Sequence, residues 1–133
     1  MTDRITGQCL CGACRYASDG PVINVRACHC RRCQRATGSA FYARVMVAWT
    51  SVAIDGPVAW FDGDTGVLRG FCPDCGTTLF SRRESAGTVG LSLGSVNDPD
   101  RFQPTDHIWT EAQQRWLILG DDLPRYRQGP PVI

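Results

Sequence analysis

Short apolar runs separated by Gly, Pro, Asn and Asp make up most of this chain. Many of them are rich in Val, Ile and aromatic residues, a composition that is typical of β-strands bounded by turns. Only two Glu occur, so the pattern gives little support for helices. Nine strands are therefore predicted, at Ala13–Ala17, Val22–Ala27, Phe41–Ala48, Ser51–Ile54, Val58–Phe61, Val67–Phe71, Thr77–Ser81, Val89–Leu93 and His107–Trp109.

Helix is predicted in only two short stretches. One covers Arg31–Ala36, and another turn is expected to begin with Thr110 as its N-cap and Glu111 in its first turn. The tail from Pro124 to Ile133 holds three Pro and is expected to run extended over the surface. No repeat or linker divides the chain. We therefore expect one mainly β domain over residues 1–133, with many short strands and one or two short helices.

Composition narrows the class of protein. The chain has 133 residues, with 43% hydrophobic and 20% charged residues, which is typical of a globular domain. Its net charge of +1 gives no general argument for a nucleic-acid partner. All 14 basic residues are Arg, so Schiff-base chemistry and a P-loop lysine are excluded. The sequence does not indicate an oligomeric state.

The N-terminal stretch Met1–Gln8 has no apolar segment of the kind found in secretion signals. No run approaches the ~18 apolar residues of a membrane-spanning helix. We therefore expect a cytoplasmic protein that does not enter a membrane. In that compartment, eight cysteines indicate metal ligands or redox groups more than a disulfide framework.

Two cysteine pairs are expected to form one closed zinc site. Cys9 and Cys11 are followed by Gly12, and Cys72-Pro73-Asp74-Cys75 is followed by Gly76. Pro73 favours the turn, and glycine relieves crowding where backbone N–H groups point at a sulfur. Two such pairs provide the four ligands of a structural zinc. A thioredoxin-like redox pair at Cys72 and Cys75 is the alternative, but the βαβ context that it needs is missing.

A second set of three cysteines lies in Cys28-His29-Cys30-Arg31-Arg32-Cys33. Three thiolates leave one position of a tetrahedral zinc free for water or substrate, as in catalytic sites. The alternative is a closed site in which His29 or Cys14 is the fourth ligand, and the spacing does not decide between them. His29 is expected to point away from the metal, because it lies between two ligands on an extended step.

Arginines lie close to this second set. A zinc with three thiolates has a net negative charge and suits an incoming thiol, which loses its proton when it binds. Arg pairs bidentately with carboxylates, so a small thiol that carries carboxylates would fit the site. Arg31 and Arg35 are the candidate carboxylate ligands, and His107 is a further candidate for a binding pocket. The alternative is a solvated arginine face and a structural histidine.

Several motifs, taken in order, resemble a known family. The motifs are Gly7–Tyr16, Cys28–Cys33, Arg69–Phe80, Asp98-Pro99 and His107-Ile108-Trp109. The chain resembles the glutathione-dependent formaldehyde-activating enzymes, a family that also includes centromere protein V, from about Gly7 to Pro124. Cys14 stands where an aliphatic residue is common, and Asn97 where Asp is common.

The resemblance implies a zinc-stapled β fold of the Mss-four-like class. It implies a structural zinc on Cys9, Cys11, Cys72 and Cys75, and a second, catalytic zinc on Cys28, Cys30 and Cys33. The implied activity is addition of glutathione to formaldehyde, which gives S-(hydroxymethyl)glutathione, and members are described as carbon–sulfur lyases. The alternatives are a zinc-stapled interaction module without chemistry and a sensor of zinc or thiol stress.

Overall fold

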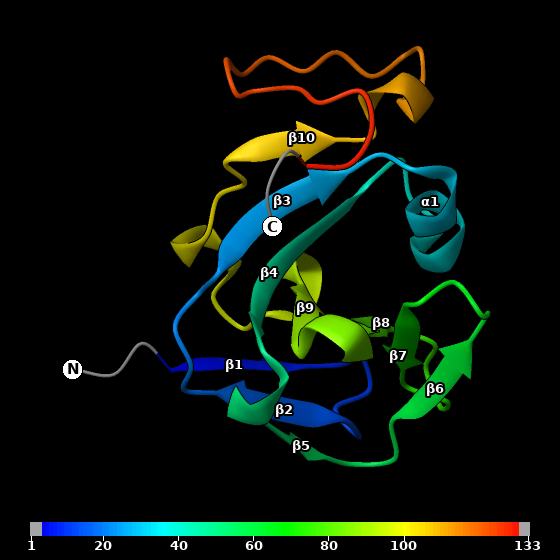
Figure 1. Cartoon of the computed structure of the whole chain (residues 1–133). Helices are drawn as coiled ribbons and strands as arrows, with labels where there is room; N and C mark the ends of the chain where they lie inside the picture. The colour runs from blue at the N-terminus through cyan, green and yellow to red at the C-terminus, as the bar shows by residue number, and fades with distance from the viewer. Residues whose placement is uncertain (1–3, 131–133) are drawn as a thin grey trace.

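The computed structural model describes residues 4–130, in which ten strands form two sheets (Figure 1). One sheet has three strands in the order β1-β2-β5, and the other has seven in the order β10-β3-β4-β9-β8-β7-β6. The strands are β1 (Ile5–Gln8), β2 (Arg15–Ser18), β3 (Asn24–Cys28), β4 (Tyr42–Ala48), β5 (Val52–Asp55), β6 (Ala59–Asp62), β7 (Leu68–Phe71), β8 (Thr78–Arg83), β9 (Thr88–Ser92) and β10 (Asp106–Ile108).

One α-helix and five short 3₁₀ helices complete the described secondary structure. They are α1 (Arg31–Thr37), η1 (Trp49–Ser51), η2 (Glu84–Ala86), η3 (Leu93–Ser95), η4 (Pro99–Arg101) and η5 (Thr110–Ala112). The mainly β fold with one short helix is confirmed. All nine predicted strands overlap an observed strand, and the predicted helix matches α1 to within one residue.

The strand β1 was not predicted. It pairs antiparallel with β2, and Gly7 lies opposite Tyr16. A Cβ atom on Gly7 would lie 2.2 Å from the Tyr16 ring. Only a glycine at this position therefore leaves room for the buried ring of Tyr16 to pack over β1. A glycine in the middle of a four-residue strand weakens the sequence signal, although it marks a close approach of this kind.

Apolar side chains from both sheets meet in the larger of two clusters. Val45, Val89 and Leu91 come from the central strands of the large sheet, while Ile5 and Tyr16 come from the small one. The β-branched and leucine side chains alternate along β4 and β9, as expected for strands that pack one face into a core. A smaller cluster lies at the other end of β3, where Cys28 and Cys33 pack with Tyr42 and Ile108.

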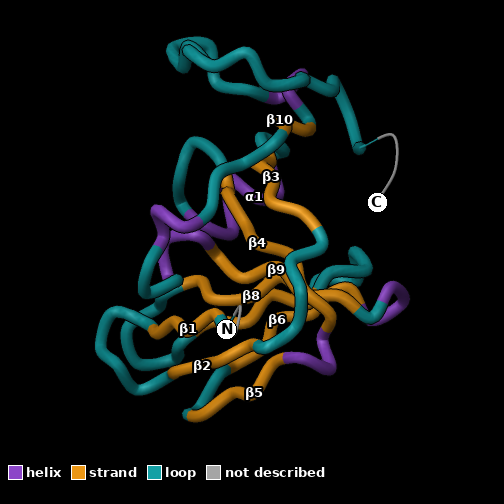
Figure 2. The backbone as a smooth tube through the Cα atoms, turned by 90° about the vertical axis from the view of Figure 1, so that its left-hand side faces the viewer, coloured by secondary structure: helices purple, strands orange, loops and turns teal. Residues whose placement is uncertain are grey.

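The C-terminal segment runs alongside the edge strand of the large sheet. β10 pairs parallel with β3, and His107 forms a bridge with Arg125 on its other side. Backbone bonds join His107 to Pro124 and Tyr126, at 2.9 and 2.8 Å. Figure 2 shows this segment as a loop beyond β10. The tail was predicted to run extended over the surface, and around Arg125 it does run alongside β10, but it bends at residues 127–129. Residues 131–133 lie outside the described part.

The prediction that Thr110 is an N-cap is wrong. The cap residue of η5 is Trp109, in the left-handed region with φ of 57°, and no side chain caps this helix. The Thr110 hydroxyl instead donates to the carbonyl of Tyr126 at 3.1 Å. This acceptor, the Tyr126 carbonyl, belongs to the C-terminal segment. The residues around Thr110 could not indicate a partner so distant in sequence.

None of the helices between residues 4 and 130 is long and apolar enough to cross a membrane.

Candidate metal centres and the adjoining cavity

Four cysteine sulfurs meet where the β1–β2 turn approaches the β7–β8 turn. The Sγ atoms of Cys9, Cys11, Cys72 and Cys75 all lie within 4.8 Å of one another. Cys11 Sγ lies 3.7 Å from Cys9 Sγ and 3.8 Å from Cys72 Sγ. A tetrahedral zinc with Zn–S bonds of about 2.3 Å places its sulfurs about 3.8 Å apart. These four residues therefore fit one tetrahedral metal ion.

Two glycines allow the turns that bring these sulfurs together. Gly12 and Gly76 have φ angles of 81° and 80°, in the left-handed region that favours glycine. The N–H of Gly76 donates to the carbonyl of Cys72 at 2.8 Å and closes the turn. Thr77 links the two turns, because its Oγ1 accepts from the Leu10 N–H at 3.0 Å. The cluster thus links the β1–β2 and β7–β8 hairpins, which are distant in sequence.

Cys14 lies beside this first cluster. It is fully buried, and its backbone N–H donates to Cys9 Sγ at 3.3 Å. Burial, together with a hydrogen bond to Cys72, raises the pKa of the Cys14 thiol to about 12. Cys14 packs in the larger apolar cluster, whereas Cys28 and Cys33 pack in the smaller one. The structure therefore does not bring Cys14 to the second set of cysteines.

The second set gathers where β3 ends and α1 begins. Cys28 is the last residue of β3, Cys30 is the N-cap of α1, and Cys33 is in its first turn. The Cys33 N–H donates to Cys30 Sγ at 3.3 Å. The three sulfurs lie within 4.8 Å of one another, and across residues 4–130 no fourth Cys, His, Asp or Glu joins them at this distance. The set can hold a metal with three protein ligands.

Proximity of the three sulfurs makes one thiolate easy to form and further ones difficult. Hydrogen bonds from Cys28 and Cys33 lower the pKa of Cys30 to about 2. The contact with Cys30, followed by that with Cys33, raises the pKa of Cys28 well above its usual range. A divalent cation is the group that would hold all three as thiolates, because a coordinated thiol is deprotonated. The donor set thus fits zinc.

Two arginines put positive charge next to this set. The guanidinium nitrogens of Arg69 lie 3.8 and 3.9 Å from Cys33 Sγ, and its Cζ lies 6.0 Å from the centre of the Tyr42 ring. Arg44 interacts electrostatically with Cys28 and Cys33, and burial lowers its pKa. Within the described part of the chain, neither arginine forms an ion pair with Asp or Glu. The charge of Arg69 therefore faces sulfur rather than carboxylate, while Arg44 Nη1 donates to Asn24 Oδ1 at 2.7 Å.

The two histidines form a chain of contacts beside the second set. His29 Nε2 lies 3.0 Å from His107 Nδ1, and His107 Nε2 lies 2.9 Å from a carboxylate oxygen of Asp121. Both rings are buried, and burial lowers the pKa of His29. His29 thus points to His107 and is not among the gathered ligands, as the extended step predicted. Asp121 was missed, because its contact depends on how the C-terminal segment folds back.

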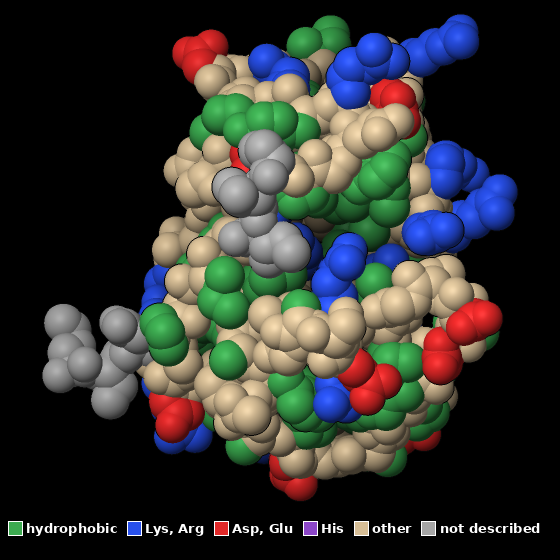
Figure 3. All heavy atoms as spheres, in the orientation of Figure 1, with side chains coloured by type: hydrophobic (Ala, Val, Ile, Leu, Met, Phe, Trp, Pro, Cys, Tyr) green, Lys and Arg blue, Asp and Glu red, His purple; other side chains and the backbone are tan. Residues whose placement is uncertain are grey.

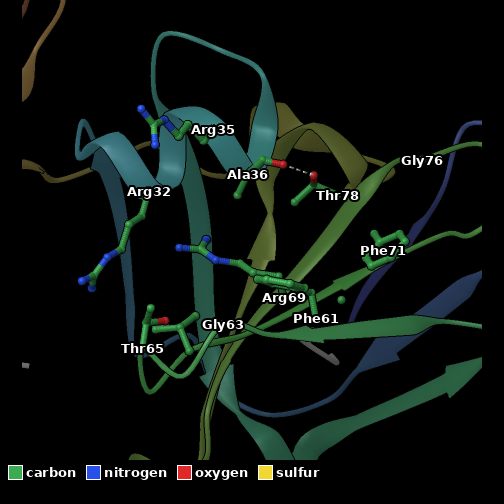
Figure 4. A pocket seen from close by; sticks show the side chains of 12 residues that line it. Arg32, Arg35, Ala36, Phe61, Gly63, Thr65, Arg69, Phe71, Gly76 and Thr78 are labelled. Carbon is green, nitrogen blue, oxygen red and sulfur yellow. Dashed lines mark hydrogen bonds between the residues drawn. The ribbon is translucent and has the colours of Figure 1, made fainter.

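A cavity of about 520 Å³ opens between α1 and the β6–β7 hairpin (Figure 4), and Arg69 of its lining reaches Cys33 Sγ. Arg69 points across it from β7, and Arg32 lies along one rim (Figure 4). Its lining residues come from α1, the β6–β7 hairpin, the β7–β8 turn and the start of β8: Arg32, Arg35, Ala36, Phe61, Gly63, Thr65, Val67, Arg69, Gly70, Phe71, Gly76 and Thr78.

Only one of the three predicted binding residues lines this cavity. Arg35 does, whereas Arg31 donates to the side-chain Oε1 of Gln34 and lies over a shallower hollow with Trp116. His107 lies in the contact chain with His29 and Asp121. Arg69 was not predicted as a site residue, and its place in the motif before Cys72 was the available signal.

Comparisons with known proteins agree with this geometry. A family model described as glutathione-dependent formaldehyde-activating enzyme matches residues 4–112. The chain belongs to this family. A crystal structure of a Rhodobacter sphaeroides protein has a similar fold, with a TM-score of 0.57, 22% sequence identity, and coverage of 74% of this chain and 96% of that chain. No curated protein sequence gives a significant match. Membership supports a formaldehyde-activating, glutathione-related function at the level of the family.

Proposed function

We propose that this protein is a zinc-dependent enzyme of the carbon–sulfur lyase type. It would join a small thiol such as glutathione to formaldehyde, or run the same reaction in reverse. The observation that carries the proposal is a set of three converging cysteines with no fourth described ligand, beside a cavity that contains arginines. A place in the cytoplasm, where such thiols stay reduced, fits this chemistry.

Cys28, Cys30 and Cys33 would hold the catalytic zinc, which would leave one coordination position for the thiol and lower its pKa. Cys9, Cys11, Cys72 and Cys75 would hold a second, structural zinc. Both assignments rest on the distances between sulfurs.

The protein's own residues would orient the substrate. Arg69 lies between the second cysteine set and the cavity, so its charge favours a thiolate at this point. Arg32 and Arg35, at the rim, would bind carboxylates at the other end of the thiol compound. Holding the thiolate in one orientation would lower the entropic cost of its attack on an aldehyde.

The bonds balance without an oxidant or reductant. The thiol loses its proton, and its sulfur forms a bond with the carbonyl carbon of formaldehyde. The π electron pair moves to the carbonyl oxygen, which takes up a proton to give the hydroxymethyl thioether. In the reverse direction the carbon–sulfur bond breaks, and the same proton movements run backwards.

Calorimetry tests the thiol step. Glutathione should bind with a heat that depends on the ionisation enthalpy of the buffer, because the thiol proton is released. S-methylglutathione has no such proton and should bind with a heat that is independent of the buffer. Cys30→Ser should abolish the proton release while leaving a folded domain.

Turnover needs its own measurement. Exchange between formaldehyde and its glutathione adduct should be faster with the protein than without it, and the acceleration should be lost in Cys30→Ser. Thiol binding with proton release but no acceleration would instead favour a thiol sensor. Two bound zinc ions without thiol binding would favour a non-catalytic interaction module.

A further inference from the structure

Three arginines line the cavity, and one of them, Arg69, reaches Cys33 Sγ. Arg32 and Arg35 are three residues apart on α1 and so project from neighbouring positions of one helical surface, and Arg69 enters from β7. Figure 3 shows arginine side chains gathered at the edge of the molecule where Figure 1 places α1. Among residues 4–130, no Asp or Glu pairs with any of these three arginines. The cavity therefore has unbalanced positive charge.

The lining of the cavity contains no acidic residue. The acids closest in sequence are Asp62, the last residue of β6, and Asp64 in the β6–β7 loop, and both are exposed. Asp62 Oδ1 accepts a hydrogen bond from the Asp64 N–H at 2.9 Å and so stabilises the turn. A positively charged group of a ligand would therefore meet guanidinium groups and no carboxylate of the lining.

The rest of the lining is largely apolar. Phe61, Val67 and Phe71 form the wall on the side of the hairpin, opposite Ala36 of α1. Such a wall suits a short chain of methylene groups that joins two acidic groups. An ammonium on that chain would lose water here without gaining a partner, which disfavours binding.

We propose that this cavity selects a thiol with two acidic groups and no free ammonium group. Glutathione has two carboxylates and one ammonium, so the preferred ligand is more anionic than glutathione. The inference rests on the proposed function only in taking the ligand to be a thiol. The charge preference comes chiefly from Arg32 and Arg69 and requires no metal.

Two probes without a thiol proton test the preference separately from metal coordination. S-methylglutathione keeps the ammonium, and N-acetyl-S-methylglutathione replaces it with a neutral amide. The acetylated probe should bind the wild-type protein about tenfold more tightly by calorimetry, as one removed like-charge contact near the surface allows. Arg32→Gln and Arg69→Gln should each weaken the acetylated probe more than the unacetylated one.

Arg83→Gln is the matched control. It removes one positive charge at the far end of β8, outside the cavity lining, and should leave the ratio of the two affinities unchanged. A ratio that stays at tenfold in Arg32→Gln and Arg69→Gln would show that these arginines do not set the preference. A ratio that falls equally in Arg83→Gln would show that net charge alone acts.

Two further outcomes would overturn the inference. Equal or tighter binding of S-methylglutathione would show that the cavity accommodates an ammonium, and a loss of that binding in Asp64→Asn would identify its partner. Failure of both probes to bind saturably would remove the cavity as a ligand site. Proton release on glutathione binding is measured independently, so it would still decide the thiol step of the proposed function.

Discussion

The two cysteine clusters differ in how the chain brings the sulfurs together and in what surrounds them. The four-cysteine cluster joins two turns 61 residues apart in sequence, between Cys11 and Cys72. The three-cysteine cluster is local, spanning residues 28–33 at the junction of a strand and a helix. A metal in the first would hold two hairpins together, whereas a metal in the second would tie together only one short segment.

The electrostatic surroundings of the two clusters also differ. Around the first cluster, sulfurs accept from backbone N–H groups and contact the hydroxyl of Thr77. Around the second, Arg44 and Arg69 contribute whole charges. Neutral donors suit a closed set of four ligands, while full positive charges suit a site that binds a further anion. This difference supports the proposed division into a structural first cluster and a catalytic second cluster.

Removing a ligand of the first cluster should have the largest effect. Cys72→Ser should unfold or insolubilise the protein, because a closed four-cysteine site contributes folding free energy outright. Circular dichroism and the yield of soluble protein measure this. A Cys72→Ser protein that remains folded and keeps two zinc ions would remove the structural role of the cluster.

Removing a ligand of the second cluster should leave the fold intact. Serine is a good N-cap, so Cys30→Ser should keep α1 while removing a metal ligand. Elemental analysis should give about two zinc ions per chain for the wild type and about one for this variant. If Cys30→Ser is as unfolded as Cys72→Ser, the second cluster is structural as well.

Sequence could predict the first cluster well and the surroundings of the second poorly. The glycines after Cys11 and Cys75 encode local turns, so their geometry is visible in the spacing. The position of Arg69 against Cys33 depends instead on the packing of the β6–β7 hairpin near α1. Motif spacing contains no information on such a long-range contact.

The same distinction between local signals and long-range contacts explains which contacts the sequence did not predict. Most strands could be predicted from runs of apolar residues, because the period of a strand is local. The contacts of His107 with Asp121 and of Thr110 with Tyr126 need the C-terminal segment to fold back along β10. Their sequence neighbours give no sign of these partners, so a ligand-binding role for His107 remains a prediction.

An intermediate effect is expected at Arg69, which tests whether charge distinguishes the clusters. Arg69→Gln should weaken zinc at the second cluster about tenfold, since groups that contact metal ligands typically contribute 10- to 100-fold to affinity. Competition with a chelator should show a lower zinc affinity at one site and an unchanged zinc affinity at the other. Arg69→Lys should keep most of the affinity. Equal weakening in the Lys variant would assign the effect to stacking on Tyr42 rather than to charge.

The smallest effect should come from Cys14, the one cysteine outside both clusters. Its thiol is buried beside Cys9 and Cys72, so Cys14→Ala removes one buried atom and should lower the free energy of unfolding by about 1 kcal/mol. The hydrogen bond to Cys9 Sγ comes from the backbone and is retained in this variant. Both zinc ions should therefore remain, as elemental analysis would show.

Cys14→Ser sharpens the same test. A hydroxyl in this place needs a partner that a thiol does not, so serine should destabilise the fold by more than alanine, by about 1–3 kcal/mol in denaturant unfolding. Loss of zinc from the three-cysteine cluster in either variant would contradict the separation of Cys14 from that cluster. It would make Cys14 the fourth ligand, closing the site that the proposed chemistry requires to be open.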